Sequence, residues 1–150
     1  MVDPDELAKR VVAHMDAKDG FSKWLGLKIV SVAPGRVVLQ ATIRKEMLNG
    51  FGVCHGGITF AIADSALGFA GNTYGRVALT MEGNVSLTKA VNEHDVLTVT
   101  AHEVSNGNRI AVYSVDMVNQ HGVHVAAVRG TLYNSTPCIS PTKPSNDRYI

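Results

Sequence analysis

Alternation of apolar and polar residues dominates the second half of the chain and predicts antiparallel strands. Four alternating segments rich in β-branched residues cover residues 77–91, 95–104, 109–120 and 123–134. Short stretches rich in Asn, Gly and His separate them, so we expect hairpin loops, one of them at Asn92-Glu93-His94. Two earlier β-branched runs, roughly 26–33 and 36–44, flank Ala33-Pro34-Gly35 and predict another hairpin.

Helical patterns occupy two other segments. Asp3-Pro4-Asp5-Glu6 has the residues of a helix start, and apolar residues follow at helical spacing up to Gly20. The segment from His55 to about Tyr74 is apolar on almost all sides, which favours a buried helix, and its many small residues indicate close packing. We therefore expect an α+β fold in which about six antiparallel strands surround one long central helix. One copy would leave the outer face of that sheet uncovered, which predicts pairing with a second copy.

Length and composition limit the class of protein. The 150 residues fit one domain, with a helix over 1–20 and a loose, proline-containing tail over 135–150. A composition of 45% hydrophobic and 18% charged residues is typical of a globular protein. The net charge of +1 gives no positive electrostatic field that would attract nucleic acid. No apolar run is long enough for a membrane span. The polar N-terminus has no secretory pattern, and two distant cysteines, Cys54 and Cys138, indicate reduced thiols in a cytoplasmic protein.

Asp64 is the only charged side chain between Gly56 and Gly75. Burial of a lone carboxylate is unfavourable unless it is hydrogen-bonded, partly solvated or raised in pKa. Asp64 is therefore either a functional acid or a residue on a wet strip of the helix. Its apolar neighbours at helical spacing, Phe60 and Leu67, favour the functional interpretation.

Two glycines open the same helix. Gly56-Gly57 at a helix N-terminus would leave backbone N–H groups uncovered, and with the helix dipole these form an anion or oxyanion site. Simple close packing explains the glycines equally well. His55 before them could orient a ligand or lie on the surface, and Cys54 has no neighbouring base that would make it a nucleophile.

Other motifs fail on spacing. Gly50-Phe51-Gly52 begins like a dinucleotide fingerprint, but its sixth position is His55 and no parallel βαβ unit follows. His102-Glu103 lacks the second histidine of a zinc-protease helix, and His121 and His124 would point to opposite faces of a strand. We expect no metal and no cofactor.

The segment LNGFGVCHGGITFAIADSALGFAGN resembles the hotdog-fold acyl-CoA thioesterases of the phenylacetate-degradation type. Their motif is an Asn six residues before a His-Gly-Gly, followed by an acid nine residues after the His. Asn49, His55-Gly56-Gly57 and Asp64 meet every spacing. The resemblance extends over roughly residues 20–135, because the order of strands and helix also matches.

The resemblance implies a role for each motif residue. Asp64 would act as nucleophile or general base, and Gly56 would give its N–H to the thioester oxygen. His55 and Asn49 would position the thioester and the attacking group. Many members carry Arg-Pro after the third strand, near a coenzyme A groove, where this chain has Lys89-Ala90. Lys89 could still hold a phosphate as a point charge. Because the proline is absent, the resemblance does not imply the path of this loop.

Helix geometry adds a condition on oligomeric state. Gly56 and Asp64 are eight residues apart, which is about 12 Å along a helix axis. One reacting carbonyl cannot touch both in one chain, so both can act only if two subunits share each site. We expect a homo-oligomer, a dimer and by resemblance a homotetramer.

The expected function is hydrolysis of acyl-CoA thioesters, with coenzyme A as part of the substrate. Aromatic acyl groups such as phenylacetyl or hydroxyphenylacetyl, and a place in phenylacetate degradation, rest on the resemblance alone. One alternative is an acyl-CoA dehydratase or hydratase of the same fold, which would need a histidine a few residues after the acid. The next histidine after Asp64 is His94. A non-catalytic acyl-CoA-binding module is the second alternative.

Overall fold

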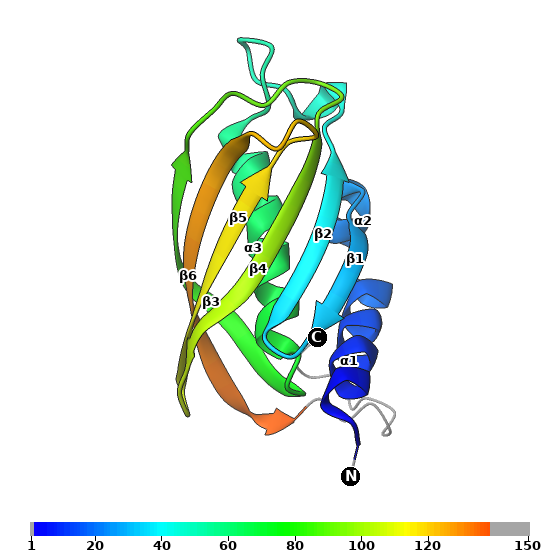
Figure 1. The fold of residues 1–150 in the computed structure, drawn as a ribbon, viewed down its shortest axis with the longest axis vertical. Coiled ribbons are helices and arrows are strands. Elements are labelled where there is room, and N and C mark those ends of the chain that lie inside the picture. The colour runs from blue at the N-terminus through cyan, green and yellow to red at the C-terminus, as the bar shows by residue number, and fades with distance from the viewer. Residues whose placement is uncertain (1, 139–150) are drawn as a thin grey trace.

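The computed structural model describes residues 2–138. Its elements are α1 (Pro4–Lys18), α2 (Gly20–Leu25), β1 (Lys28–Ala33), β2 (Arg36–Thr42), the short 3-10 helix η1 (Lys45–Met47), α3 (Gly56–Asn72), β3 (Arg76–Leu87), β4 (Val96–Asn106), β5 (Ile110–Val118) and β6 (His124–Cys138). Six antiparallel strands form one sheet in the order β1-β2-β4-β5-β6-β3 and curl around α3 (Figure 1). The predicted combination of a six-stranded sheet and a central helix is confirmed.

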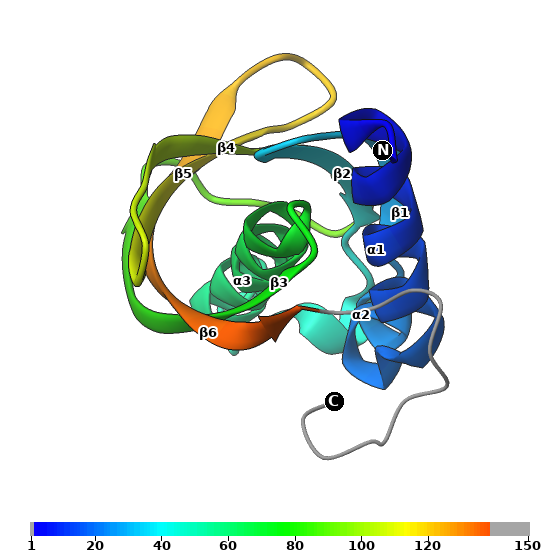
Figure 2. The same cartoon turned by 90° about the horizontal axis from the view of Figure 1, so that it is seen from below.

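The N-terminal segment forms two helices rather than one. The Asp3 side chain accepts a hydrogen bond from the Asp5 N–H and caps α1. Asp19 then caps α2 by accepting from the Ser22 N–H at 2.9 Å, so the chain restarts a helix where the prediction ended. Seen along α3, α1 and α2 lie on the open side of the curled sheet, beside β1 (Figure 2).

Close contacts between glycines and large side chains seat α3 in the sheet. A methyl group added at any of three glycines would crowd the end of a side chain from the facing element, so glycine allows the close approach without displacing that side chain. The pairs are Gly71 of α3 under Leu132, Gly130 of β6 under Leu67, and Gly83 of β3 under Phe60. Because these contacts come from both ends of the helix and from two strands, they fix its position along its own axis.

The connection between β3 and β4 is not the predicted hairpin at Asn92-Glu93-His94. β3 pairs with β6, while β4 lies between β2 and β5. The intervening loop passes over the N-terminal end of α3 (Figure 1). Asp95 holds it there by accepting from the Asn92 N–H at 2.8 Å and from the Gln120 side chain at 2.7 Å. A turn-rich sequence permits a crossing as readily as a hairpin, so the pattern alone could not distinguish them.

This topology places β3 at an edge of the sheet, with one side of its backbone unpaired within the chain. Every residue from 81 to 90 is exposed. Its exposed apolar side chains are Leu79, Met81, Val85 and Leu87. A long, apolar open edge is a template for another strand.

Two details concern the ends of the described chain. β6 continues to Cys138, which is four residues into the segment expected to be a tail, and residues 139–150 lie outside the described residues. No helix within residues 2–138 is long and apolar enough to cross a membrane.

Candidate functional site

The first turn of α3 offers one open backbone donor. His55 is the N-cap, and its Nδ1 accepts a hydrogen bond from the Gly57 N–H at 3.0 Å. The expectation that both glycine N–H groups are open is therefore wrong for Gly57. In the neutral ring this bond leaves the proton on Nε2, which can donate. Within the described residues the Gly56 N–H has no acceptor, so it is the donor left at the dipole's positive end.

Asn49 builds the loop that precedes the helix. Its Oδ1 accepts from the Phe51 N–H at 2.9 Å and from the Val53 N–H at 3.4 Å. Its backbone N–H donates to the Val53 carbonyl at 2.8 Å, which closes the turn. The side-chain oxygen is thus committed to the loop, and the amide NH₂ is the part of Asn49 that can act on a ligand.

We call the hollow beside this turn the glycine pocket. It has a volume of about 280 Å³ and is lined by Asn49, Val53, Cys54, Gly56, Thr59, Leu87, Thr88, Lys89, Ala90, Val91 and Val125. Lys89, which the resemblance suggested as a phosphate contact, is the only cationic residue of that lining. Burial raises the pKa of the Cys54 thiol, which opposes formation of the reactive thiolate.

A larger hollow, which we call the acid cavity, lies further along α3. Its volume is about 700 Å³, and its lining residues are Met15, Lys18, Asp19, Gly20, Phe21, Asp64, Ser65, Gly68, Phe69, Asn72, Val77, Ala78, Leu79 and Thr80. Asp64 is half-buried, and its Oδ1 is fully buried without a hydrogen-bond partner. A carboxylate oxygen on a wet strip would not be buried, so the wet-strip interpretation does not describe Asp64.

Most other polar groups of the acid cavity are committed to the protein. The Ser22 hydroxyl donates to Asp19 Oδ2 at 2.5 Å, so Ser65 must donate in the Ser22–Ser65 contact at 3.0 Å. The Asn72 amide bonds to backbone atoms of α3 and β3. Thr80 is a cavity residue that the sequence pattern did not single out, because only the β3–β6 pairing turns the start of β3 towards Asp64.

The structure divides the predicted site residues between two places. Asn49, Gly56 and Lys89 lie in the glycine pocket, whereas Asp64 lies in the acid cavity, and His55 caps the helix between loop and pocket. The predicted eight-residue separation on one helix is present. β3 connects the two places, because its first residues line the acid cavity and its last residue lines the glycine pocket.

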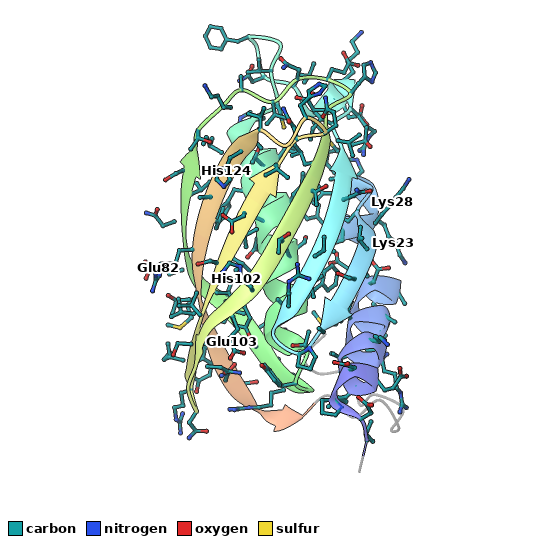
Figure 3. The ribbon with its side chains drawn as sticks, viewed as in Figure 1. Lys23, Lys28, Glu82, His102, Glu103 and His124 are labelled. Atoms are coloured by element: carbon teal, nitrogen blue, oxygen red, sulfur yellow. The ribbon has the colours of Figure 1, made fainter. Side chains whose placement is uncertain are left out.

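None of the remaining histidines is among the lining residues of either hollow. His102 and His124 come from β4 and β6 (Figure 3). His102 alternates with buried Ala101 and so faces outward, and His124 Nε2 lies 3.2 Å from Asp116 Oδ1 on the exposed surface. Across residues 2–138 no three or more His, Cys, Asp or Glu side chains gather as metal ligands would.

Comparisons with known proteins place this chain in a family. The model of the thioesterase superfamily matches residues 51–126. The acyl-coenzyme A thioesterase PaaI of Escherichia coli is 36% identical over 119 residues, which are 79% of this chain and 85% of that protein. Its structure, described as that of the PaaI protein from the phenylacetic acid degradation operon, has a TM-score of 0.89 at 31% identity and covers 92% of this chain and 100% of its own.

Two further relatives are more distant. Human acyl-coenzyme A thioesterase 13 is 27% identical over 115 residues, which are 75% of this chain and 82% of that protein. A hypothetical thioesterase of Streptococcus pneumoniae, solved with coenzyme A, has a TM-score of 0.71 at 28% identity and covers 73% of this chain and 88% of its own. It was also solved as two alanine variants, one at an aspartate and one at a threonine sixteen residues further along.

The curled sheet, its central helix and these matches define a hotdog-fold thioester hydrolase. The chain belongs to the thioesterase superfamily. The predicted fold and the resemblance to thioesterases of the phenylacetate-degradation type are confirmed.

Proposed function

We propose that the protein hydrolyses acyl-CoA thioesters at sites that combine the glycine pocket of one subunit with the acid cavity of another. The observation that carries the proposal is Asp64, which lines a cavity large enough for a substrate group and has one carboxylate oxygen, Oδ1, buried without a hydrogen-bond partner. Unpartnered buried polar atoms are rare in folded proteins, and a catalytic role is one of the explanations for them.

Each half supplies what the other lacks. The Gly56 N–H would donate to the thioester oxygen as negative charge develops there. The Asn49 amide and the His55 Nε2–H would hold the thioester in register. Asp64 would either remove a proton from a water that attacks the carbonyl carbon, or attack that carbon itself to form a mixed anhydride that water then hydrolyses. In both routes the C–S bond breaks and the free acid is released. Coenzyme A leaves as a thiolate, which takes up the proton held by Asp64 in the first route and a proton from water in the second.

Thr80 is a candidate holder of the attacking water. Its side chain lines the acid cavity with Asp64, and no hydrogen bond within the described residues uses its hydroxyl. Thr80 follows Asp64 by sixteen residues. The aspartate and threonine replaced in the streptococcal thioesterase have the same separation.

The open edge of β3 supports the sharing of sites. Residues Val77–Thr80 line the acid cavity and Leu87 lines the glycine pocket, so the two hollows lie at opposite ends of one strand. If the β3 strands of two copies pair antiparallel about a two-fold axis, the start of each lies beside the end of the other. The acid cavity of one subunit then meets the glycine pocket of its partner. Two such dimers would form the expected tetramer.

The proposed substrate is an aryl acyl-CoA such as phenylacetyl-CoA or hydroxyphenylacetyl-CoA. The acid cavity contains two aromatic side chains, Phe21 and Phe69, and several aliphatic ones, which suit an aromatic acyl group. Lys89 would bind a phosphate of coenzyme A. The operon named for the E. coli structure supports a place in phenylacetate degradation, and the unpaired, buried Cys54 supports a reducing compartment such as the cytoplasm.

Neither alternative function has support of this kind. A dehydratase or hydratase of this fold would need a histidine a few residues after the acid, and the next histidine in the chain after Asp64 is His94. A binding module would not need an unpartnered buried carboxylate.

The test is release of free thiol from a panel of acyl-CoAs that contains phenylacetyl-, hydroxyphenylacetyl-, acetyl- and palmitoyl-CoA. We expect hydrolysis of the aryl substrates with the highest kcat/KM. Binding of acyl-CoA without any thiol release would instead establish the binding module, and preference for palmitoyl-CoA would refute the proposed substrate class.

A further inference from the structure

Gly68 differs from the other glycines of α3. A methyl group added at Gly56, Gly57 or Gly71 would crowd a neighbouring side chain, whereas one added at Gly68 meets no atom within 4 Å. The backbone of Gly68 is helical, so any L-residue can adopt it. Glycine in a helix interior is less favourable than alanine. Neither backbone conformation nor packing therefore explains glycine at this position.

Gly68 lies in the wall of the acid cavity. It follows Asp64 by four residues, so it is on the same face of α3 and about 6 Å further along the axis. The space that a side chain would fill at Gly68 therefore belongs to the cavity beside the acid. We propose that Gly68 determines the size of the acyl group that reaches Asp64, by leaving room for an aryl ring. This inference rests on the proposed function of the acid cavity.

A second wall of the cavity is tied to neighbouring elements by side-chain contacts. It comes from the end of α1 and from α2, and includes Phe21, whose ring stacks on that of Trp24 at 6.0 Å between centroids. Arg44 lies over the Trp24 ring and donates to the Trp24 carbonyl at 2.7 Å. The Ser65–Ser22 hydrogen bond joins α2 to α3 one residue after Asp64.

The surroundings of Gly68 favour an apolar ligand group. Asn72, the next polar residue on this face of α3, donates to the carbonyls of Gly68 and Ala78, both at 2.8 Å. Its Oδ1 accepts from the Ala78 N–H at 3.0 Å. With its amide used in this way, the cavity floor beyond Asp64 offers Phe69 and the bare backbone of Gly68 to the substrate.

The experiment compares Gly68→Ala and Gly68→Leu with the parent. The measured quantity is the ratio of kcat/KM for phenylacetyl-CoA to kcat/KM for acetyl-CoA. We expect this ratio to fall about tenfold in Gly68→Ala and about a hundredfold in Gly68→Leu, the range that one or a few carbons contribute in a tight pocket. The melting temperature of Gly68→Ala should rise by about 2–4 °C, because alanine favours the helix.

Gly71→Ala is the matched control on the same helix. Its methyl group would collide with Leu132 in the core, so the melting temperature should fall while the substrate ratio stays at the parent value. A lower melting temperature together with a lower substrate ratio in the Gly68 variants would indicate general damage to α3. That result, or an unchanged ratio in both Gly68 variants, would overturn the inference.

A binding measurement separates this inference from the proposed function. Phenacyl-CoA is a thioether that cannot be hydrolysed, and its affinity should fall at least tenfold in Gly68→Leu relative to the affinity for coenzyme A. If the parent releases no thiol but this selective loss of affinity is present, the proposed hydrolysis fails and the role of Gly68 stands. If the parent hydrolyses aryl-CoA but the Gly68 variants keep the parent affinity for phenacyl-CoA and the parent ratio of kcat/KM values, the role of Gly68 is refuted and the proposed hydrolysis stands.

Discussion

The first and third turns of α3 differ in the chemical groups that they place beside a hollow. The first turn presents a backbone donor, the Gly56 N–H, in a small pocket with a lysine. The third turn places the carboxylate of Asp64 in the lining of a cavity more than twice as large and mainly apolar. A hydrogen-bond donor alone can bind an oxyanion but cannot activate a nucleophile. A carboxylate alone can activate a nucleophile but does not hold the carbonyl that it must attack. This difference is the basis of the proposal that each chain contributes two complementary half-sites and that a second chain completes each site.

Removal of the acid should give the largest effect. Asp64→Asn keeps the shape of the side chain but removes the base, so kcat should fall about 10²-fold or more. Initial rates of thiol release measure it. The matched control is Asp116→Asn on the outer sheet face, where the parent rate is expected. Full activity of Asp64→Asn would refute the role of the third turn.

Changes at the first turn should have smaller effects. Asn49→Ala and His55→Ala each remove one positioning hydrogen bond, which corresponds to a loss of about tenfold in kcat/KM. Both also support local structure, so circular dichroism and melting temperature should accompany the kinetics. If His55→Ala loses more activity than Asp64→Asn, the histidine is the base and the roles of the two turns are exchanged.

Mixed oligomers test whether the half-sites belong to different chains. One chain carries Asp64→Asn and the other carries both Asn49→Ala and His55→Ala, so each homodimer has two damaged sites. A mixed dimer has one intact site, and random mixing makes half of the dimers mixed. Co-refolding should therefore restore about a quarter of the parent activity. Activity equal to the average of the two separate variants would mean that each site lies within one chain.

Chelation should have no effect. The proposed reaction uses a backbone donor and a carboxylate, neither of which needs a metal. Protein dialysed against EDTA should keep the parent kcat/KM in the thiol-release assay. Loss of activity that zinc restores would show that the division into donor and acceptor halves omits a metal centre.

The sequence predicted those parts of the molecule that depend on neighbouring residues in the chain. Burial of Asp64 was expected because Phe60 and Leu67 flank it at helical spacing, and the position of the α3 N-terminus was expected from His55 and the glycines. The strand that pairs with β3 was not predicted, because a loop with turn residues is compatible with either a hairpin or a crossing over the helix. Thr80 and the Ser22–Ser65 bond were missed for a related reason, since each depends on elements that meet only after the sheet has curled.

The seating of α3 has a consequence for how such a chain can vary. Phe60 and Leu67 of the helix lie against Gly83 and Gly130 of the strands, and Gly71 of the helix lies under Leu132. These contacts oppose any sliding of the helix that would compensate for a change in its length. One residue inserted between Gly56 and Asp64 would turn the acid by about 100° and advance it by about 1.5 Å, away from the acid cavity. Substitutions of apolar residues in this stretch can be absorbed by repacking, whereas an insertion or deletion cannot. The helix therefore fixes the spacing between Gly56 and Asp64, and the number of residues between them matters to the proposed site as much as their identities.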